Sequence, residues 1–445
     1  MAAGLRTGPY RVVEGPLGPV PWYMVPFDKA GRATGPLTAR ELVDRAAGGD
    51  FSDLVLFSHG WNNDWVQATA RYQSFVDGYL DLLGERPPPG GARRALLAGV
   101  FWPSKLLVAE DREMLEIAGD GADAAVADER DDVAELAERL PAEDAGRFYA
   151  LAQRDVLDGE AARELARVLA PLLATDDLET AEPEPPSVEE MLAAWSATGP
   201  TRAAPVADLD DLGFRPAAPV AAPEVAGDLA FLDPREVVRS MSVWLMKDRA
   251  GVVGGNGVAP LLADLLRTDV RVHCVGHSYG AKVLLSAICS GRALPRPVRS
   301  LLLLQPAVSH LCFAASVPGS GKPGGYRGAL ERVELPIVTT FSAHDQPLTR
   351  FFHLALRRGR DLGEPEVAAA GEPPNRYAAL GGFGPRGADA DTVVVPAADP
   401  GEPYDLGPPG PEVLAVDATR TISGHGDVSN RSTWWMLSQL LHAPG

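Results

Sequence analysis

The sequence predicts an α/β fold, in which helices cover both faces of a mostly parallel β-sheet. Short apolar segments rich in β-branched residues alternate along the chain with segments of helical periodicity, such as 270–275 followed by 281–289. Parallel strands are joined by crossover connections, and the helices in those connections shield both sides of the sheet. The 445 residues are enough for one large domain of this class with an insertion.

The individual elements follow from the same patterns. Strands are predicted, in chain order, near 22–25, at 53–58, on a following segment that reaches Trp102, and at 270–275, 298–304, 335–342 and 412–418. Helices are predicted near 37–47, from about Trp65 onward, at 131–140, 161–173 and 281–289.

One short motif at a strand–helix junction points to chemistry. Residues 276–280 read Gly-His-Ser-Tyr-Gly between the strand at 270–275 and the helix at 281–289. A G-x-S-x-G in this context is a nucleophile elbow, a sharp turn in which the serine backbone is strained. The small residues Gly276 and Gly280 let the strand and the helix approach each other. Ser278 Oγ is therefore expected above the sheet at a helix N-terminus, which favours developing negative charge.

A serine nucleophile needs a base, and the base needs an orienting acid. With a nucleophile elbow, the acid and then the histidine follow the serine in the chain, each after a strand. The strand at 335–342 leads to Asp345, which we predict to be the acid. The strand at 412–418 leads to His425, which we predict to be the base.

Other titratable residues near these strands leave alternatives open. His310 is a second choice for the base, and Asp417 or Asp427 could orient His425 in place of Asp345. His344 precedes the acid, which is the wrong order for the base. Local packing or hydrogen bonding is the expected role of the two histidines nearest the elbow in the chain, His273 and His277.

The loop after the strand at 53–58 is predicted to form part of an oxyanion hole. One backbone N–H should come from Tyr279, next to the nucleophile, and a second from an early loop, where Trp61 is the chosen donor. Gly60 lets that loop turn close to the substrate, and His59 is expected to orient it. The following polar residues either pin the loop or cap the next helix: Asn62, Asn63 and Asp64.

The pair of motifs H-G-W-N-N and G-H-S-Y-G resembles the α/β-hydrolase superfamily of serine esterases and lipases, most closely bacterial members with an H-G-[WY]-N loop. Further landmarks of that branch are Met-Val-Pro-Phe-Asp at 24–28, Phe-Trp-Pro-Ser at 101–104 and Lys-Asp-Arg-Ala-Gly-Val-Val-Gly at 247–254. The resemblance covers about 20–104 and 235–440. It implies an α/β-hydrolase fold and hydrolysis of an ester, thioester or amide through an acyl-enzyme.

The chain is expected to divide into an N-terminal extension with the first sheet elements (1–50), a core (51–104 and 231–445) and an insertion (105–230). The insertion begins with acidic helical segments and becomes rich in proline and alanine, which predicts loose structure. It should hang over the carboxyl edge of the sheet, where the serine lies. There it would act as a helical lid or cap; the alternative is a partner-docking or merely tolerated insertion.

Composition limits the partners. A formal net charge of −19 argues against binding to nucleic acid or to an anionic membrane surface. Without an apparent signal segment or a run of 18 apolar residues, the chain is expected to be soluble, cytoplasmic and without a membrane span. No metal and no organic cofactor is expected, and the oligomeric state is left open. The three cysteines are expected to be buried free thiols: Cys274, Cys289 and Cys312.

The sequence thus predicts an esterase- or lipase-like serine hydrolase that acts on a small-molecule acyl ester. One alternative is a thioesterase or other acyl hydrolase acting on a carrier-bound substrate. A local basic patch for such a substrate could be formed by Arg350, Arg357, Arg358 and Arg360, which solvated arginines at a helix C-terminus explain equally well. The other is a non-catalytic binding or regulatory protein of the same fold, whose working surface is the acidic insertion.

Overall fold

The computed structural model describes residues 7–61, 63–88, 93–104, 133–134, 136–154, 156–173, 187–189, 191–192, 195, 234–318, 321–345, 348–349, 378–388, 391–407 and 410–444. Its strands are β1 (Arg11–Gly15), β2 (Gly18–Pro26), β3 (Asp53–Ser58), β4 (Ala95–Phe101), β5 (Arg271–His277), β6 (Ser300–Leu304), β7 (Ile337–Phe341), β8 (Thr392–Pro396) and β9 (Val413–Asp417). Its helices are α1 (Pro36–Ala47), α2 (Trp65–Glu85), α5 (Ala142–Ala152), α6 (Gly159–Leu169), α9 (Pro234–Val252), α10 (Ala259–Leu265), α11 (Tyr279–Cys289), α13 (Leu380–Phe383) and α14 (Arg431–His442).

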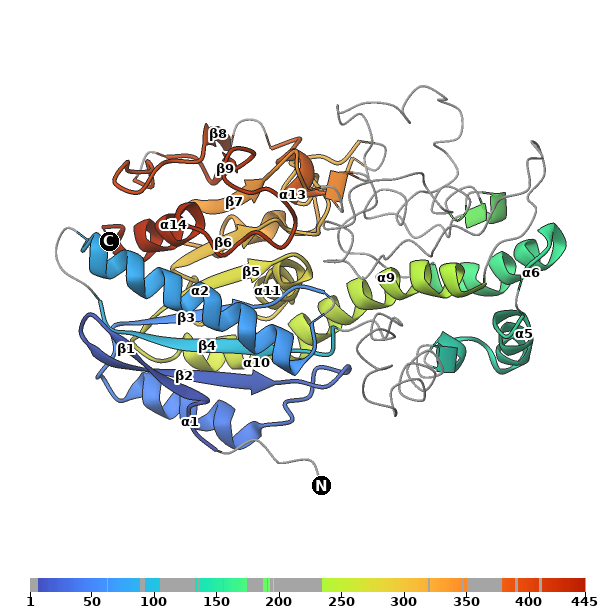
Figure 1. The fold of residues 1–445 in the computed structure, drawn as a ribbon, viewed down its shortest axis with the longest axis horizontal. Coiled ribbons are helices and arrows are strands. Elements are labelled where there is room, and N and C mark those ends of the chain that lie inside the picture. Colours follow the sequence, from blue (N-terminus) through green and yellow to red (C-terminus); the bar gives the residue numbers. More distant parts are fainter. Residues whose placement is uncertain are drawn as a thin grey trace, which may run out of the picture.

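These strands form a single nine-stranded sheet in the order β1-β2-β4-β3-β5-β6-β7-β9-β8 (Figure 1). Every neighbouring pair is parallel except the hairpin of β1 and β2. The predicted α/β class and mostly parallel sheet are therefore confirmed. The two edge strands, β1 and β8, were not predicted. β8 reads Thr-Val-Val-Val-Pro, a β-branched run typical of a strand, and exposes Val393 and Val394 to solvent.

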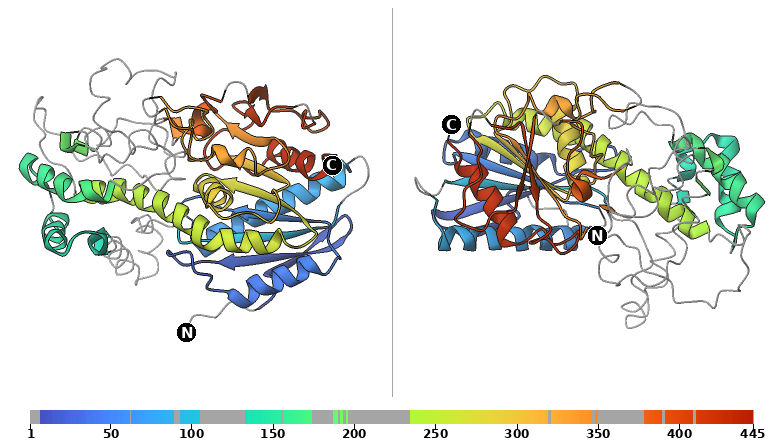
Figure 2. Two further views of the ribbon diagram at one scale, coloured as in Figure 1. Left: turned by 180° about the vertical axis from the view of Figure 1, so that it is seen from behind. Right: turned by 90° about the horizontal axis from the view of Figure 1, so that it is seen from above.

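Side chains alternate between the two faces of the sheet and build a separate core on each. In β3, Leu54 and Leu56 join the cluster that contains α1, α9, α10 and α11, while Val55 and Phe57 join the cluster under α2 and α14. Figure 1 and the left view of Figure 2 show these two helix layers on opposite faces of the sheet. Both faces are buried, as a parallel sheet requires.

Close packing against α11 depends on a glycine in the opposing helix. A π-helical turn, Val253–Val258, joins α9 to α10. A Cβ added at Gly254 in this turn would lie 2.3 Å from the carbonyl oxygen of Val283 in α11. Only a residue without a side chain allows the two helices to approach this closely. The helix that follows the predicted nucleophile is thereby packed tightly against the turn that joins α9 to α10.

Strand order also determines which loops meet. Within the sheet, β3 has β4 as its neighbour on one side and β5 on the other. The chain therefore passes from β3 to β4 in one direction and then crosses back over β3 to β5. The carboxyl ends of β3 and β5 therefore flank a topological switch point, the place where open α/β sheets bind ligands. The loop with His59, Gly60 and Trp61 follows β3, and Ser278 follows β5, so the predicted site residues lie at this point.

A buried polar network connects β3, β5 and β6 near the amino ends of these strands, at the end of the sheet away from Ser278. His273 lies 3.0 Å from Asp53 through Nε2 and 2.7 Å from Ser300 Oγ through Nδ1, and Arg271 pairs with the same aspartate at 2.8 Å. Burial raises the pKa of Asp53, but hydrogen bonds from His273, Arg271 and Ser52 outweigh it and the pKa is lowered. His273 is thus a hydrogen-bonded core residue, as the sequence indicated.

The described part of the insertion packs on α9, beyond the carboxyl edge of the sheet (Figure 1). Helices α5 and α6 supply Phe148, Leu151 and Leu165 to a hydrophobic cluster that also contains Val237 and Met241 of α9. Arg139 forms a 2.7 Å ion pair with Asp248 of α9. Helix α9 therefore connects the insertion to the sheet.

The cysteines are all free; Cys274 and Cys312 are buried, and Cys289 is partly exposed. No helix within the described residues is long and apolar enough to cross a membrane.

Candidate active site

Three predicted residues form one chain of hydrogen bonds. Ser278 Oγ lies 2.8 Å from Nε2 of His425, and Nδ1 of His425 lies 2.8 Å from Oδ2 of Asp345. They come from three different places in the fold: the β5–α11 turn, the loop after β7 and the loop between β9 and α14. All three are at least 97% buried. The structure thus brings together the serine, histidine and aspartate that strand order indicated.

The serine stands in a strained turn. Its backbone has φ 55° and ψ −125°, in the left-handed region that non-glycine residues rarely occupy. A Cβ added at Gly276 would lie 2.7 Å from Ala281 Cα, and one at Gly280 would lie 2.1 Å from the carbonyl oxygen of Ser58. These two positions admit only glycine, which agrees with the expected geometry of the elbow.

The alternative acids and bases lie elsewhere. Asp417 accepts a hydrogen bond from the backbone of Thr419, and Asp427 accepts two from Ser423, so neither holds His425. The His344 side chain is exposed although its neighbour Asp345 is fully buried. His310 is buried, and its ring makes no hydrogen bond within the described residues.

Asp345 is held by two donors besides His425. The backbone N–H of Leu348 donates to Oδ1 at 3.0 Å, and Nε2 of Gln305 donates to Oδ2 at 2.9 Å. Gln305 was missed in the sequence because only a carboxylate was sought after β6. Gln305 stands at the end of a buried strand that pairs with β7, but a glutamine there carries no distinctive sequence signal.

His277 ties the elbow to the loop of the histidine. Its Nε2 lies 2.9 Å from the carbonyl oxygen of His425, so the ring carries its proton on Nε2 and donates to that oxygen. Burial, followed by the neighbouring His425, lowers the pKa of His277 well below 6.5, which keeps the ring neutral. The local hydrogen bonding expected for His277 is confirmed, and it fixes the backbone of His425 beside Ser278.

The loop after β3 is held by a second group of buried polar residues. His59 Nε2 accepts from the backbone N–H of Trp102 at 3.3 Å, so Nδ1 donates to the carbonyl oxygen of Gly60 at 2.8 Å. Asn63 Nδ2 donates to the carbonyl oxygens of Gly60 and Trp61 at 3.2 and 2.7 Å. The carbonyl oxygens of Gly60 and Trp61 are therefore engaged by this buried group. His59 orients the loop, as expected.

The sequence left open whether the remaining polar residues of this loop pin the loop or cap the next helix. Both roles are present in the structure. Asn63 pins the loop, and Asp64 caps α2 by accepting from the N–H of Gln67 at 2.8 Å in a reciprocal capping box. Ser104 Oγ, which the sequence did not indicate, accepts from the N–H of Asn63 at 3.2 Å. Asn62 lies outside the described residues, as do Arg350, Arg357, Arg358 and Arg360.

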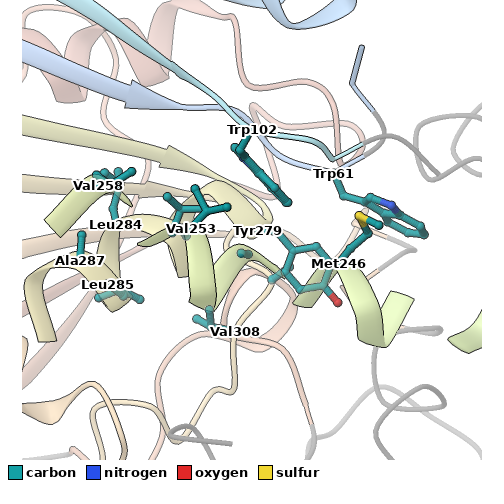
Figure 3. Packing of buried hydrophobic residues seen from close by; sticks show 14 of the residues in the cluster. Trp61, Trp102, Met246, Val253, Val258, Tyr279, Leu284, Leu285, Ala287 and Val308 are labelled. Carbon is teal, nitrogen blue, oxygen red and sulfur yellow. The ribbon is translucent and has the colours of Figure 1, made fainter. Parts of the chain in front are cut away.

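The loop and the elbow meet at Gly60. A Cβ added at this glycine would lie 2.6 Å from Ser278 Cβ, so the Gly60–Trp61 backbone passes directly beside the serine. The rings of Trp61 and Tyr279 then form an edge contact with centroids 6.4 Å apart. Figure 3 shows both rings at the end of the hydrophobic cluster where Met246 of α9 also lies. The two predicted oxyanion donors thus belong to adjacent pieces of backbone.

No group of three or more His, Cys, Asp or Glu side chains is arranged to hold a metal ion in the ranges that the structure describes. No protein-family model, curated protein or solved structure matches the chain.

Acidification is expected to destabilise the fold because several histidines are buried in the neutral form. Burial lowers the pKa of His59 and of His310 from 6.5 to about 4. The unfolded chain binds protons near pH 6.5 that the folded chain does not, so stability falls as pH drops from about 6.5 toward 4. Each of these two histidines should lower the free energy of unfolding by about 3 kcal/mol as the pH drops through this range.

Urea denaturation between pH 7.5 and 4 measures this loss. The variant His310→Leu should keep its stability near pH 7 and lose about 3 kcal/mol less on acidification, since the His310 ring has no hydrogen-bond partner among the described residues. A variant with the same pH dependence as the wild type would contradict the assignment for His310.

Proposed function

We propose that this protein is a serine hydrolase of the α/β-hydrolase type that cleaves small carboxylic esters through an acyl-enzyme. The observation that carries the proposal is the Ser278–His425–Asp345 hydrogen-bond chain, with the serine in a strained strand–helix turn. Structural serines have no need of a left-handed backbone. Such strain at a buried nucleophilic group is typical of functional sites.

In the proposed reaction, neutral His425 carries its proton on Nδ1, donates it in a hydrogen bond to Asp345, and accepts the Ser278 hydroxyl proton at Nε2. The serine oxygen attacks the ester carbonyl as that proton moves to the histidine. His425 then returns the proton to the departing alkoxide, and the acyl group remains on Ser278. A water molecule, deprotonated by His425, attacks the acyl carbonyl; the bond from that carbon to Ser278 Oγ breaks, the carboxylic acid leaves, and His425 returns the proton to Oγ. Asp345 orients the imidazole and stabilises its positive charge in both steps.

The negative charge that develops on the carbonyl oxygen needs donors that are already in place. We assign the backbone N–H groups of Tyr279 and Trp61 to this oxyanion hole. The close approach of Gly60 to Ser278 supports the assignment, as does the hydrogen bonding of the loop carbonyls to Asn63 and His59. With these carbonyls engaged by His59 and Asn63, the loop would present N–H groups to the substrate.

The insertion is proposed to act as a lid or cap over this site. Arg249 of α9 donates to the carbonyl oxygen of Pro103 at 2.9 Å, next to the segment that holds His59 and Asn63. Met246, on the same helix, belongs to the cluster that contains Trp61 and Tyr279. These contacts connect α9 to both proposed oxyanion donors, so the insertion would shape the substrate pocket through this helix.

Reaction with a fluorophosphonate, followed by intact-mass measurement, tests the proposal. The wild type should gain one adduct and the variant Ser278→Ala none. A matched control is Ser286→Ala, because Ser286 is a buried serine two turns further along α11; this variant should react like the wild type. Short-chain p-nitrophenyl esters then test turnover. A wild type with neither adduct nor turnover would contradict catalysis and favour a non-catalytic binding protein.

A further inference from the structure

Gln305 occupies an unusual position at the end of β6. Its side chain is fully buried, and its φ of 44° makes it, with Ser278, one of two non-glycine residues with positive φ in the described chain. A left-handed backbone costs a residue without special tolerance about 1–2 kcal/mol. Such a conformation persists where the surroundings hold the residue firmly. The surroundings of Gln305 are Thr340 of β7, Gly381 and the acid Asp345.

The hydrogen bonds of Thr340 fix which end of the Gln305 amide faces the acid. The backbone N–H of Gln305 donates to Thr340 Oγ1 at 2.9 Å, so the hydroxyl oxygen acts as acceptor there. The single hydroxyl proton is then free to be donated to Oε1 of Gln305, also at 2.9 Å. With Oε1 committed to Thr340, Nε2 points to Asp345 Oδ2 at 2.9 Å and toward the Gly381 carbonyl oxygen at 3.4 Å.

The same carboxylate oxygen receives the histidine. Oδ2 of Asp345 accepts from both Gln305 Nε2 and His425 Nδ1, while Oδ1 accepts from the Leu348 backbone. The Gln305 amide therefore prevents the carboxylate from rotating about its χ2 axis. Asp345 is the charged group that contacts the Gln305 side chain, and the same carboxylate oxygen also accepts from His425. The other two neighbours, Thr340 and Gly381, carry no charge.

From this geometry we infer that Gln305 is a positioning residue for the hydrolysis proposed above, on which the inference rests. Its amide holds Asp345 Oδ2 where His425 Nδ1 meets it, and Thr340 holds the amide. The inferred unit thus has five members in sequence: Thr340, Gln305, Asp345, His425 and Ser278. The first two do not touch the reacting atoms and act through the carboxylate.

Removing the donor should lower turnover without weakening substrate binding. The variant Gln305→Met keeps the length of the side chain and lacks the amide, and we expect kcat for a short-chain p-nitrophenyl ester to fall about 10- to 100-fold, with KM changed less than threefold. Thr340→Val should give a smaller fall in the same direction. Thr339→Val is the matched control, since this neighbouring buried threonine makes no side-chain hydrogen bond in the described chain; its kcat should not change.

A carboxyl group at position 305 gives a change in the pH dependence of kcat/KM that a purely packing role of Gln305 would not produce. In Gln305→Glu, the introduced carboxyl can donate to Asp345 only while it is protonated, and the adjacent carboxylate and burial both favour the protonated form. Activity should therefore match that of the wild type at neutral pH and fall as pH rises above it, which adds an alkaline limb to kcat/KM. The wild type and Gln305→Met should not have this limb.

Labelling rates with a fluorophosphonate separate the two levels of the proposal. A wild type that neither labels nor turns over ester would overturn the proposed function and this inference with it. A wild type that labels, together with Gln305→Met and Thr340→Val variants that label and turn over at the wild-type rate, would overturn the role of Gln305 alone. A Gln305→Glu profile without the alkaline limb would also overturn it.

Discussion

Replacing His425 by alanine is expected to lower kcat for ester hydrolysis by about 10⁴- to 10⁶-fold, close to the loss for Ser278→Ala. The serine then has no acceptor for its proton, because His425 Nε2 lies 2.8 Å from Ser278 Oγ. Asp345→Asn should lower kcat by about 10⁴-fold. In that variant the amide offers a donor to Nδ1, and the imidazole takes the tautomer with its proton on Nε2, facing the serine.

Steady-state kinetics with a short-chain p-nitrophenyl ester measures these losses. His344→Ala is the control, since His344 is exposed and adjoins Asp345 in the chain; it should keep wild-type activity. Circular dichroism establishes that each variant is folded. An alanine variant of His425 that retains activity within tenfold of the wild type would mean that another group serves as base, and His310 would be tested next.

The chain order of the site could be predicted because it depends on a rule of topology. Functional groups of a parallel sheet collect where strands end, so Ser278, Asp345 and His425 were found by locating β5, β7 and β9. Each of these strands is largely buried; β7 and β9 read as apolar or β-branched runs, and β5 as a β-branched segment interrupted by His273. The central sheet was predictable for the same reason.

The supporting residues could not be found in this way. Gln305 acts only through contacts with Thr340 and Asp345, 35 and 40 residues further along the chain, and glutamine at a strand end carries no distinctive pattern. Ser104 meets Asn63 across 41 residues. Side-chain partners at such separations depend on strand register, which a single sequence determines poorly.

The edge strands were missed for a different reason. A strand at the edge of a sheet is partly exposed, so its residues need not form the continuous apolar run that marks a buried parallel strand. β1 reads Arg-Val-Val-Glu-Gly, and its side chains are exposed or half-buried. The lack of an apolar run explains why β1 was not predicted, whereas β8 reads Thr-Val-Val-Val-Pro and its exposure does not account for its omission.

Replacing Gly280 by alanine is expected to destabilise the protein by more than about 3 kcal/mol and to abolish activity in any molecules that fold. The added Cβ would lie 2.1 Å from the carbonyl oxygen of Ser58 and 2.5 Å from that of His59. Both are main-chain atoms, so neither can rotate aside. The strain can be relieved only if α11 moves away from β3, which separates Ser278 from the Gly60–Trp61 backbone.

Urea denaturation and fluorophosphonate labelling of the same samples test both parts of this prediction. Gly255→Ala is the matched control, because Gly255 is also helical and a Cβ there would meet no atom within 4 Å. Alanine favours helix over glycine, so the stability of the control should be unchanged or up to about 1 kcal/mol higher. If Gly280→Ala behaved like Gly255→Ala, the close contact between the strand–helix turn at Ser278 and the loop after β3 would not be required, and the proposed geometry of the site would be wrong.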